Sequence, residues 1–185
     1  MIKNQFTPLN MARIAVCTAL LCVLSPLAIP MPFPVPLTLQ VFAVLLTALI
    51  LSPLQALTAQ LLYTLLGFIG LPVFSGGKSG FAALASPTGG FIIGFIIASF
   101  LVSLLKGKGE GKSAVIRYIA VSVLVGIPSV YIPGILWFSV IQQVDVITSA
   151  KLVAASFILF DVAKCVAASL IAVPVNAALK KIKQP

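Results

Sequence analysis

The stretch FILFDVAKCVAA, residues Phe157–Ala168, places Asp161 and Lys164 inside an otherwise apolar run. They are the only charges in the 28 residues between Lys151 and Lys180, and about 20 helical residues are enough to cross a bilayer. Because they are three residues apart, the two side chains share one face of a helix. Ionisable groups inside a membrane usually face a bundle interior or a cavity. The pair therefore predicts either an ion pair that holds two helices together or a site for a polar, uncharged group that needs an acceptor and a donor.

The composition of the whole chain agrees with a membrane location. Among its 185 residues, 61% are hydrophobic and 8% are charged, whereas a soluble domain carries about 25% charged residues. One helical bundle is the simplest use of this length. The sequence therefore predicts an all-α integral membrane protein, with a single domain over residues 1–185 that passes several times through the lipid bilayer of the cell membrane.

Six transmembrane helices are expected from the apolar runs. They are predicted to cover residues 12–29, 37–52, 54–69, 87–105, 116–141 and 152–179. The second and third meet at Ser52–Pro53 and should form a tight helical hairpin. Pro87 suits the first turn of the fourth helix, with Ser86 as its N-cap. Pro128 and Pro133 are expected to interrupt the fifth helix.

Three predicted loops on one side of the bundle are long or unusual in composition. Residues Ile29–Pro36, IPMPFPVP, contain four prolines in eight positions and should form an extended loop. Residues Gly70–Gly90 are rich in Gly, Ser and Pro, and Gln142–Lys151 are expected to form a polar loop. This asymmetry suggests that a ligand enters from that side.

The basic residues predict which side faces the cytoplasm. The net charge of +9 does not indicate nucleic-acid binding, because most of the Lys and Arg residues lie where topology signals lie. The side with both termini and the central loop carries nine of them: Lys3, Arg13, Lys106, Lys108, Lys112, Arg117, Lys180, Lys181 and Lys183. The opposite side carries Lys78 and Lys151. Both termini are therefore predicted to be cytoplasmic, with the three unusual loops outside.

Several chemistries are not expected. The sequence has no histidine and only three acidic residues, so no metal site is predicted. Cys17, Cys22 and Cys165 lie within apolar spans and are interpreted as small buried side chains rather than a disulfide framework. No Walker A sequence is present, and no nucleophile is paired with a base. Neither a cofactor nor an enzymatic activity is therefore expected.

Several stretches together resemble one family. They are VPLTLQ (Val35–Gln40), YTLLGFIGLPVFSGG (Tyr63–Gly77), SPTGGFIIGF (Ser86–Phe95), YIPGILW (Tyr131–Trp137) and the Asp161/Lys164 pair. Over almost its whole length the chain is similar to the BioY family, the substrate-binding membrane subunits (S components) of energy-coupling-factor (ECF) biotin transporters. The G-L-P-V-F and P-T-G-G-F segments, at this separation, are the specific part of the resemblance.

The resemblance implies a six-helix bundle that binds biotin from outside for high-affinity uptake. The ureido ring of biotin offers two N–H donors and one carbonyl acceptor, so Asp161 is expected to accept from an N–H and Lys164 to donate to the carbonyl. The family usually has Pro-Gly before its aspartate, where this chain has Leu159 and Phe160. The last helix should therefore be more regular here.

Apolar walls are expected around the bicyclic ring and the valeryl chain of biotin. Tyr63, Phe74 and Trp137 are the candidates, although aromatic side chains in membrane proteins more often serve packing or the interface. Gln40, at the start of the second helix, is expected either to hydrogen-bond the ligand or to cap loop backbone.

The carboxylate of biotin needs a partner near the outer face. Lys78 is one candidate, and an ordinary solvated loop charge is an equally good interpretation of it. The other candidate is the N-terminus of the fourth helix at Pro87–Gly90, including Thr88, because free N–H groups and the helix dipole attract anions.

Partner subunits are also implied by the resemblance. Ala15 and Ala19 have the small-xxx-small spacing that allows close helix approach, and in the family such a face docks onto the transmembrane coupling subunit, which works with two ATPase subunits. Alternatives remain open at this point: a solitary biotin carrier without ATPases, an intramembrane enzyme that uses Asp161 and Lys164, or a structural membrane subunit with a buried ion pair.

Overall fold

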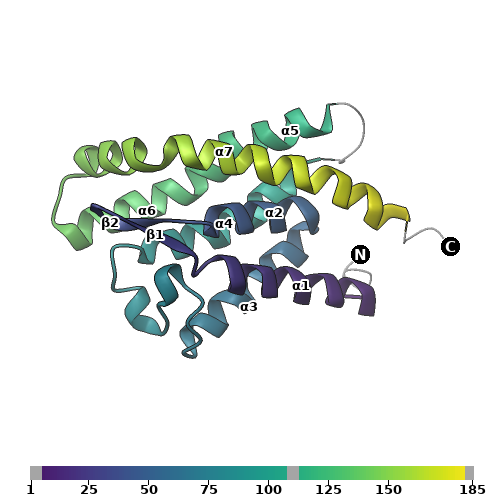
Figure 1. Ribbon diagram of the computed structural model, residues 1–185, viewed down its shortest axis with the longest axis horizontal. Coiled ribbons are helices and arrows are strands. Elements are labelled where there is room, and N and C mark those ends of the chain that lie inside the picture. Colours follow the sequence, from purple (N-terminus) through teal and green to yellow (C-terminus); the bar gives the residue numbers. More distant parts are fainter. Residues whose placement is uncertain (1–5, 108–112, 182–185) are drawn as a thin grey trace.

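Helices packed side by side dominate the structure, a computed structural model that describes residues 6–107 and 113–181 (Figure 1). The described helices are α1 (Pro8–Leu24), α2 (Gln40–Ile50), α3 (Pro53–Phe68), α4 (Gly89–Leu105), α5 (Ala114–Val121), α6 (Ile127–Gln142) and α7 (Val146–Lys181). A π-helical turn, η4 (Ser122–Gly126), joins α5 to α6 without a break. Within the described part of the chain there are thus six helical segments, as the sequence predicts.

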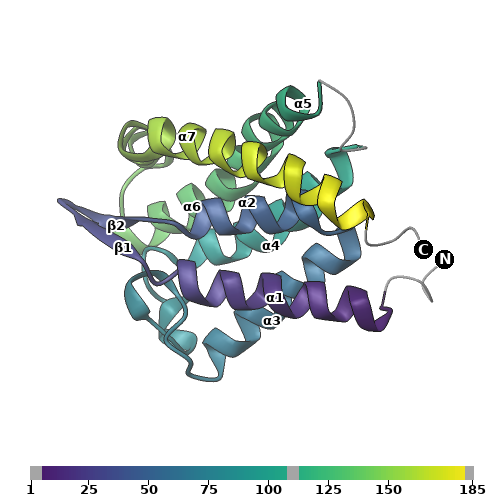
Figure 2. The same cartoon turned by 45° about the vertical axis from the view of Figure 1, so that its right-hand side comes forward.

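Two of these segments are long and apolar enough to cross a membrane, namely Ala114–Gln142 with 29 residues and Val146–Lys181 with 36 residues. Three others, α1, α2 and α4, are apolar but shorter. The first turn of α1 and the last turn of α7 lie at the same end of the bundle (Figure 2), where an Arg13 Nη2 donates to the carbonyl oxygen of Leu179 at 3.3 Å.

The hairpin between α2 and α3 is confirmed at the predicted position. Ser52 begins α3 with a capping box, in which Gln55 reaches back to the Ser52 backbone, and Pro53 occupies the first turn. The last carbonyl groups of α2, just before this turn, have no partner within the helix. Lys106 donates to the carbonyl oxygen of Leu49 at 2.9 Å, and Asn176 donates to the same oxygen at 2.9 Å.

The proline-rich segment is not a plain loop, so the all-α prediction needs a correction. Strands β1 (Ala28–Met31) and β2 (Phe33–Thr38) pair antiparallel, with Ala28 opposite Thr38. Proline favours the extended backbone of a strand but has no N–H to donate. A two-stranded sheet has two outer edges where that N–H is not needed, so the prolines are tolerated there.

Several predicted helix bounds are wrong. Helix α1 covers Pro8–Leu24 rather than residues 12–29, and α2 begins at Gln40 rather than at residue 37, because the segment between them forms β1 and β2 instead of helix. Helix α4 begins at Gly89 with Thr88 as its N-cap residue, rather than at Pro87 after Ser86, because the Ser86 side chain is engaged with the carbonyl of Ala83 in the preceding turn at 2.7 Å. Helix α7 begins at Val146 rather than at residue 152.

The polar segment before residue 152 forms the first turns of α7. The Thr148 backbone N–H donates to Oδ1 of Asp145 at 2.9 Å, which satisfies one of the free donors at this helix start. Hydrogen bonds from the Thr148 side chain and backbone also lower the pKa of the exposed Asp145 carboxyl. Helix α7 then continues without a break through Leu159 and Phe160, as expected from the absence of Pro-Gly there.

The prolines of the fifth segment do not break it. The π-helical turn Ser122–Gly126 directly precedes Pro128, and Pro133 lies inside α6. A π-turn redistributes the backbone hydrogen bonds where a proline cannot donate. The predicted interruption is therefore a local change of helix type.

Helices α4 and α6 approach closely enough to require glycine between them. A Cβ atom added at Gly94 would lie 2.8 Å from the Cα atom of Val130, a separation that forces one helix to shift. This contact fixes the second turn of α4 next to the first turn of α6, and both elements contribute to the pocket described below.

Candidate functional site

Asp161 and Lys164 form an ion pair on α7. Nζ of Lys164 lies 2.8 Å from Oδ1 of Asp161. Asp161 is buried, with 3% of its surface exposed. Its second oxygen, Oδ2, accepts a hydrogen bond at 2.8 Å from the hydroxyl of Tyr131 on α6. Both carboxylate oxygens therefore have a charged or strongly polar partner, and the carboxylate is fixed in orientation.

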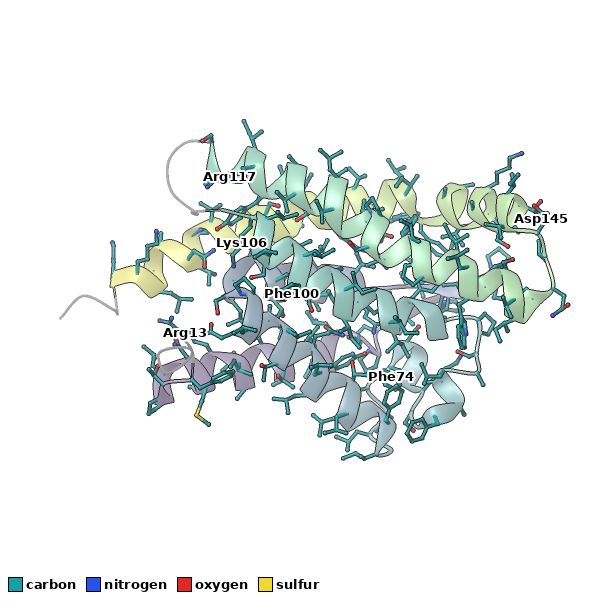
Figure 3. The ribbon with its side chains drawn as sticks, turned by 180° about the vertical axis from the view of Figure 1, so that it is seen from behind. Arg13, Phe74, Phe100, Lys106, Arg117 and Asp145 are labelled. Carbon is teal, nitrogen blue, oxygen red and sulfur yellow. The ribbon has the colours of Figure 1, made fainter. Side chains whose placement is uncertain are left out.

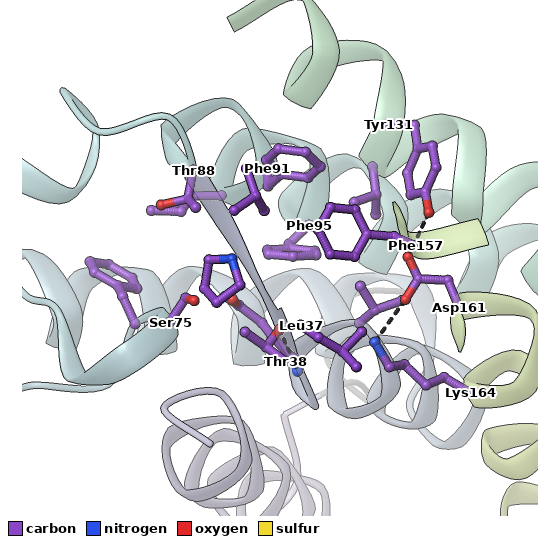
Figure 4. Close-up of a pocket in the computed structure, with 17 residues that line it drawn as sticks. Leu37, Thr38, Ser75, Thr88, Phe91, Phe95, Tyr131, Phe157, Asp161 and Lys164 are labelled. Carbon is purple, nitrogen blue, oxygen red and sulfur yellow. Dashed lines mark hydrogen bonds and ion pairs between the residues drawn. The ribbon is translucent and has the colours of Figure 1, made fainter. Parts of the chain in front are cut away.

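The charged pair lies at the wall of a pocket whose empty volume is about 560 Å³, counting the space at its open mouth. Strand β2, the starts of α2 and α4, the 3₁₀ turn η2 (Ser75–Gly77), α6 and α7 all contribute. The lining residues are Val35, Pro36, Leu37, Thr38, Gln40, Val41, Phe74, Ser75, Thr88, Phe91, Ile92, Phe95, Val130, Tyr131, Phe157, Asp161 and Lys164 (Figure 4).

Five of the eight predicted ligand-binding residues line this one pocket. They are Gln40, Phe74, Thr88, Asp161 and Lys164, which are distant in sequence and are brought together by the fold. Most of the remaining lining is aliphatic or aromatic, so the pocket offers apolar walls with a charged pair at one end.

Tyr63 lies behind the pocket wall and holds Gln40. It is fully buried. Its hydroxyl accepts from Nε2 of Gln40 at 2.8 Å and donates to the carbonyl oxygen of Val73 at 3.0 Å. Gln40 itself lines the pocket, so Tyr63 connects a pocket side chain to the loop that carries Phe74.

Lys78 and Trp137 lie outside the pocket lining. Lys78 is exposed, and its carbonyl oxygen accepts from the backbone N–H of Phe74 at 3.0 Å. The indole Nε1 of Trp137 donates to the carbonyl oxygen of Ser86 at 3.2 Å. Trp137 therefore stabilises the turn that leads into α4.

Ala15 and Ala19 occupy the exposed face of α1. The opposite face of the same helix is buried, with Ile14, Cys17 and Leu21 in the core. Nothing in the described part of the chain covers the two alanines, as a docking face requires.

Sequence reasoning missed three polar residues that line the pocket, Thr38, Ser75 and Tyr131. Tyr131 was expected only as part of a family motif, and it is 30 residues from the carboxylate that it contacts. Ser75 follows Phe74 in the loop and turns its hydroxyl into the pocket (Figure 4). No local pattern marks these residues, because their places in the pocket depend on which elements become neighbours.

Together the fold and the pocket define a class: a helical membrane protein with an internal pocket that has apolar walls and one charged end. The described residues contain no group of His, Cys, Asp and Glu that could hold a metal ion.

Comparison with known proteins identifies the family. The BioY family profile matches residues 2–181, and the chain belongs to that family. It is 40% identical over 157 residues to the biotin transporter BioY2 of Lactococcus lactis, which covers 85% of this chain and 84% of that protein. It is 36% identical over 163 residues to the biotin transporter BioY of Thermotoga maritima, with 88% and 93% covered.

A solved structure has the same fold. It is the crystal structure of the S component for biotin from an ECF-type ABC transporter, and it superimposes with a TM-score of 0.83 at 25% identity, covering 93% of this chain and 95% of that one. The family and these relatives are transporters and not enzymes, in agreement with the prediction from the sequence.

Proposed function

We propose that this chain is a biotin-binding S component of an ECF-type transporter, which takes up biotin with high affinity across the cell membrane. The observation that carries the proposal is the Asp161–Lys164 pair at the wall of an otherwise mainly apolar pocket. Relatives that match most of the chain are named as biotin transporters, and the structural neighbour is named as the S component for biotin.

The ureido group of biotin suits the charged end. Lys164 has three N–H donors, of which one is directed to Asp161, so donors remain for the ureido carbonyl. Asp161 offers about four lone-pair sites on two oxygens, and Lys164 and Tyr131 use one each. A ureido N–H can therefore donate to Asp161 without displacing either partner.

Selectivity follows from the same geometry. A ligand without the ureido N–H or carbonyl leaves buried polar groups unpaired, which a site of this kind rejects strongly. The apolar walls at Leu37, Phe91 and Phe95 fit the ring and the aliphatic chain. Phe74 serves as a further wall, whereas Gln40 acts as a polar side contact held by Tyr63.

The distribution of basic residues supports a pocket on the outer side. Figure 3 shows Arg13, Lys106 and Arg117 at one end of the bundle and Asp145 at the other. Lys3, Lys108, Lys112 and Lys183 lie outside the described residues, but the remaining basic residues keep the same bias. An excess of Lys and Arg marks the cytoplasmic side, so we place the termini inside and the β1–β2 hairpin outside, with six membrane crossings.

Release to the cytoplasm requires partner subunits in this proposal. The chain has no Walker A sequence, so the energy comes from two ATPases through a transmembrane coupling subunit. The uncovered face at Ala15 and Ala19 is the docking surface, since small side chains allow another helix to approach closely.

Two measurements test the proposal. A titration of the purified protein with labelled biotin, competed by analogues altered in the ureido ring, should give saturable binding that unlabelled biotin abolishes and the analogues do not. A structural membrane subunit would show no saturable binding. Uptake into proteoliposomes should require the coupling subunit, the ATPases and ATP; equal uptake by the chain alone would instead identify a solitary carrier.

A further inference from the structure

The pocket has a second polar end, away from the charged pair. Figure 4 shows Ser75 and Thr88 at one end and Asp161 and Lys164 at the other, with Leu37 between them. A ligand that spans the pocket therefore meets charges at one end and hydroxyl groups at the other. A hydroxyl has only one proton to donate. The groups that this second end can bind therefore depend on whether the protons of Ser75 and Thr88 are already used within the protein.

The proton of Thr88 is already used. Oγ of Ser86 donates to the carbonyl oxygen of Ala83 at 2.7 Å, so Ser86 has no second proton to give. Oγ of Ser86 and Oγ1 of Thr88 lie 2.8 Å apart, and Thr88 must be the donor in this contact. Thr88 can then only accept a hydrogen bond from a ligand.

The proton of Ser75 is free. Ser75 is 7% exposed, and its Oγ has no hydrogen-bond partner among the residues that the structure describes. Buried hydroxyl groups nearly always have a partner, and a buried group without one needs an explanation. The hydroxyl points into the pocket (Figure 4), where a bound ligand is the available partner.

We propose that Ser75 donates a hydrogen bond to the carboxylate of the bound ligand and thereby makes the pocket selective for an acid over its uncharged analogues. The inference deepens the proposed function and rests on it, since it takes the ligand to be biotin. A carboxylate only accepts hydrogen bonds, which matches the free donor of Ser75 and not the committed proton of Thr88. Lys78, the nearest candidate cation in sequence, is exposed and outside the pocket lining.

The test combines one substitution with one change in the ligand. The affinity of wild type and of Ser75→Ala is measured for biotin and for an analogue with a methyl group in place of the carboxylate. Ser75→Ala should weaken biotin binding about tenfold, as expected for the loss of a charge-assisted hydrogen bond, and should leave the affinity for the methyl analogue unchanged. Ser79→Ala is the control, because Ser79 lies in the same loop but not in the pocket lining.

Each result separates this inference from the proposed function. An unchanged affinity of Ser75→Ala for biotin would overturn the role of Ser75 while leaving biotin binding intact. An equal loss for both ligands would assign Ser75 to packing and would also overturn it. If wild type binds neither ligand, the proposed function itself fails. Thermal stability of Ser75→Ala, measured without ligand, should equal that of Ser79→Ala.

Discussion

The hydroxyl of Tyr131 on α6 donates to Oδ2 of Asp161 on α7 at 2.8 Å. Lys164, on the same helix as Asp161, donates to the other oxygen at 2.8 Å. The carboxylate therefore has one partner on α6 and one on α7. A carboxylate fixed in this way presents its remaining lone pairs in one direction, toward the pocket that it lines. In the proposed function, Tyr131 therefore orients the acceptor for a ureido N–H.

Replacing Tyr131 by Phe should weaken biotin binding about tenfold. The change removes one hydrogen bond to a charged group, which contributes about 1.5–3 kcal/mol, and about 1.4 kcal/mol corresponds to a factor of ten in affinity. The measurement is a titration with labelled biotin.

Tyr118→Phe is the matched control for this variant. Tyr118 is also buried, and its hydroxyl accepts from Asn176 at 3.1 Å, but it does not line the pocket. We expect Tyr118→Phe to lower thermal stability and to keep the wild-type affinity. Equal affinities of the two variants would show that the Tyr131 contact does not orient the site.

The helical hairpin and the charged pair could be predicted from sequence because their signals are local. Ser52–Pro53 gives a cap followed by a residue that suits a helix start. Asp161 and Lys164 are three residues apart on one helix, so their contact follows from helix geometry alone. The start of α7 could have been found in the same way, since Asp145 with Thr148 has the spacing of an N-cap.

The rest of the site depends on tertiary packing. Tyr131 reaches Asp161 only because α6 lies beside α7, and Ser75 reaches the pocket only because η2 packs against β2. The β1–β2 hairpin was missed because four prolines predict extended backbone but do not reveal pairing. Trp137 and Lys78 were expected at the ligand from the resemblance, and the structure places them outside the pocket lining.

Substituting Trp for Ala15 or Ala19 should prevent assembly with the coupling subunit. The bulk of the indole keeps a partner helix away from α1, while the pocket is unaffected because neither alanine lines it. Co-purification of the complex and biotin titration of the isolated chain measure the two effects separately. Ala82→Trp, at an exposed alanine in the 3₁₀ turn η3 (Phe81–Ala83), is the control. Normal assembly of both α1 variants would contradict the docking surface.

The orientation in the membrane can be tested by cysteine labelling. In a variant without Cys17, Cys22 and Cys165, a cysteine introduced at the exposed Lys78 should react with an impermeant maleimide on intact cells. A cysteine at the exposed Ser113, next to the basic central loop, should react only after the cells are opened. The reverse pattern would place the termini outside.

At the centre of the proposed function, Asp161 and Lys164 together recognise the ureido group of the ligand. Asp161→Asn keeps the size of the side chain but leaves Lys164 without its charged partner, and Lys164→Met leaves the buried Asp161 with Tyr131 but without a cation; breaking a pair of this kind is strongly unfavourable. Each change also removes a charge-assisted hydrogen bond to the ureido group. Because either substitution breaks the same unit, the two effects should not add in the double variant.

The most direct measurement is therefore a titration of folded wild type, Asp161→Asn, Lys164→Met and the double variant with labelled biotin, together with their thermal stabilities. We expect at least about a tenfold loss of affinity in each single variant and little further loss in the double variant. Single variants that are less stable but bind biotin with wild-type affinity would contradict it, since the pair would then only hold the fold together.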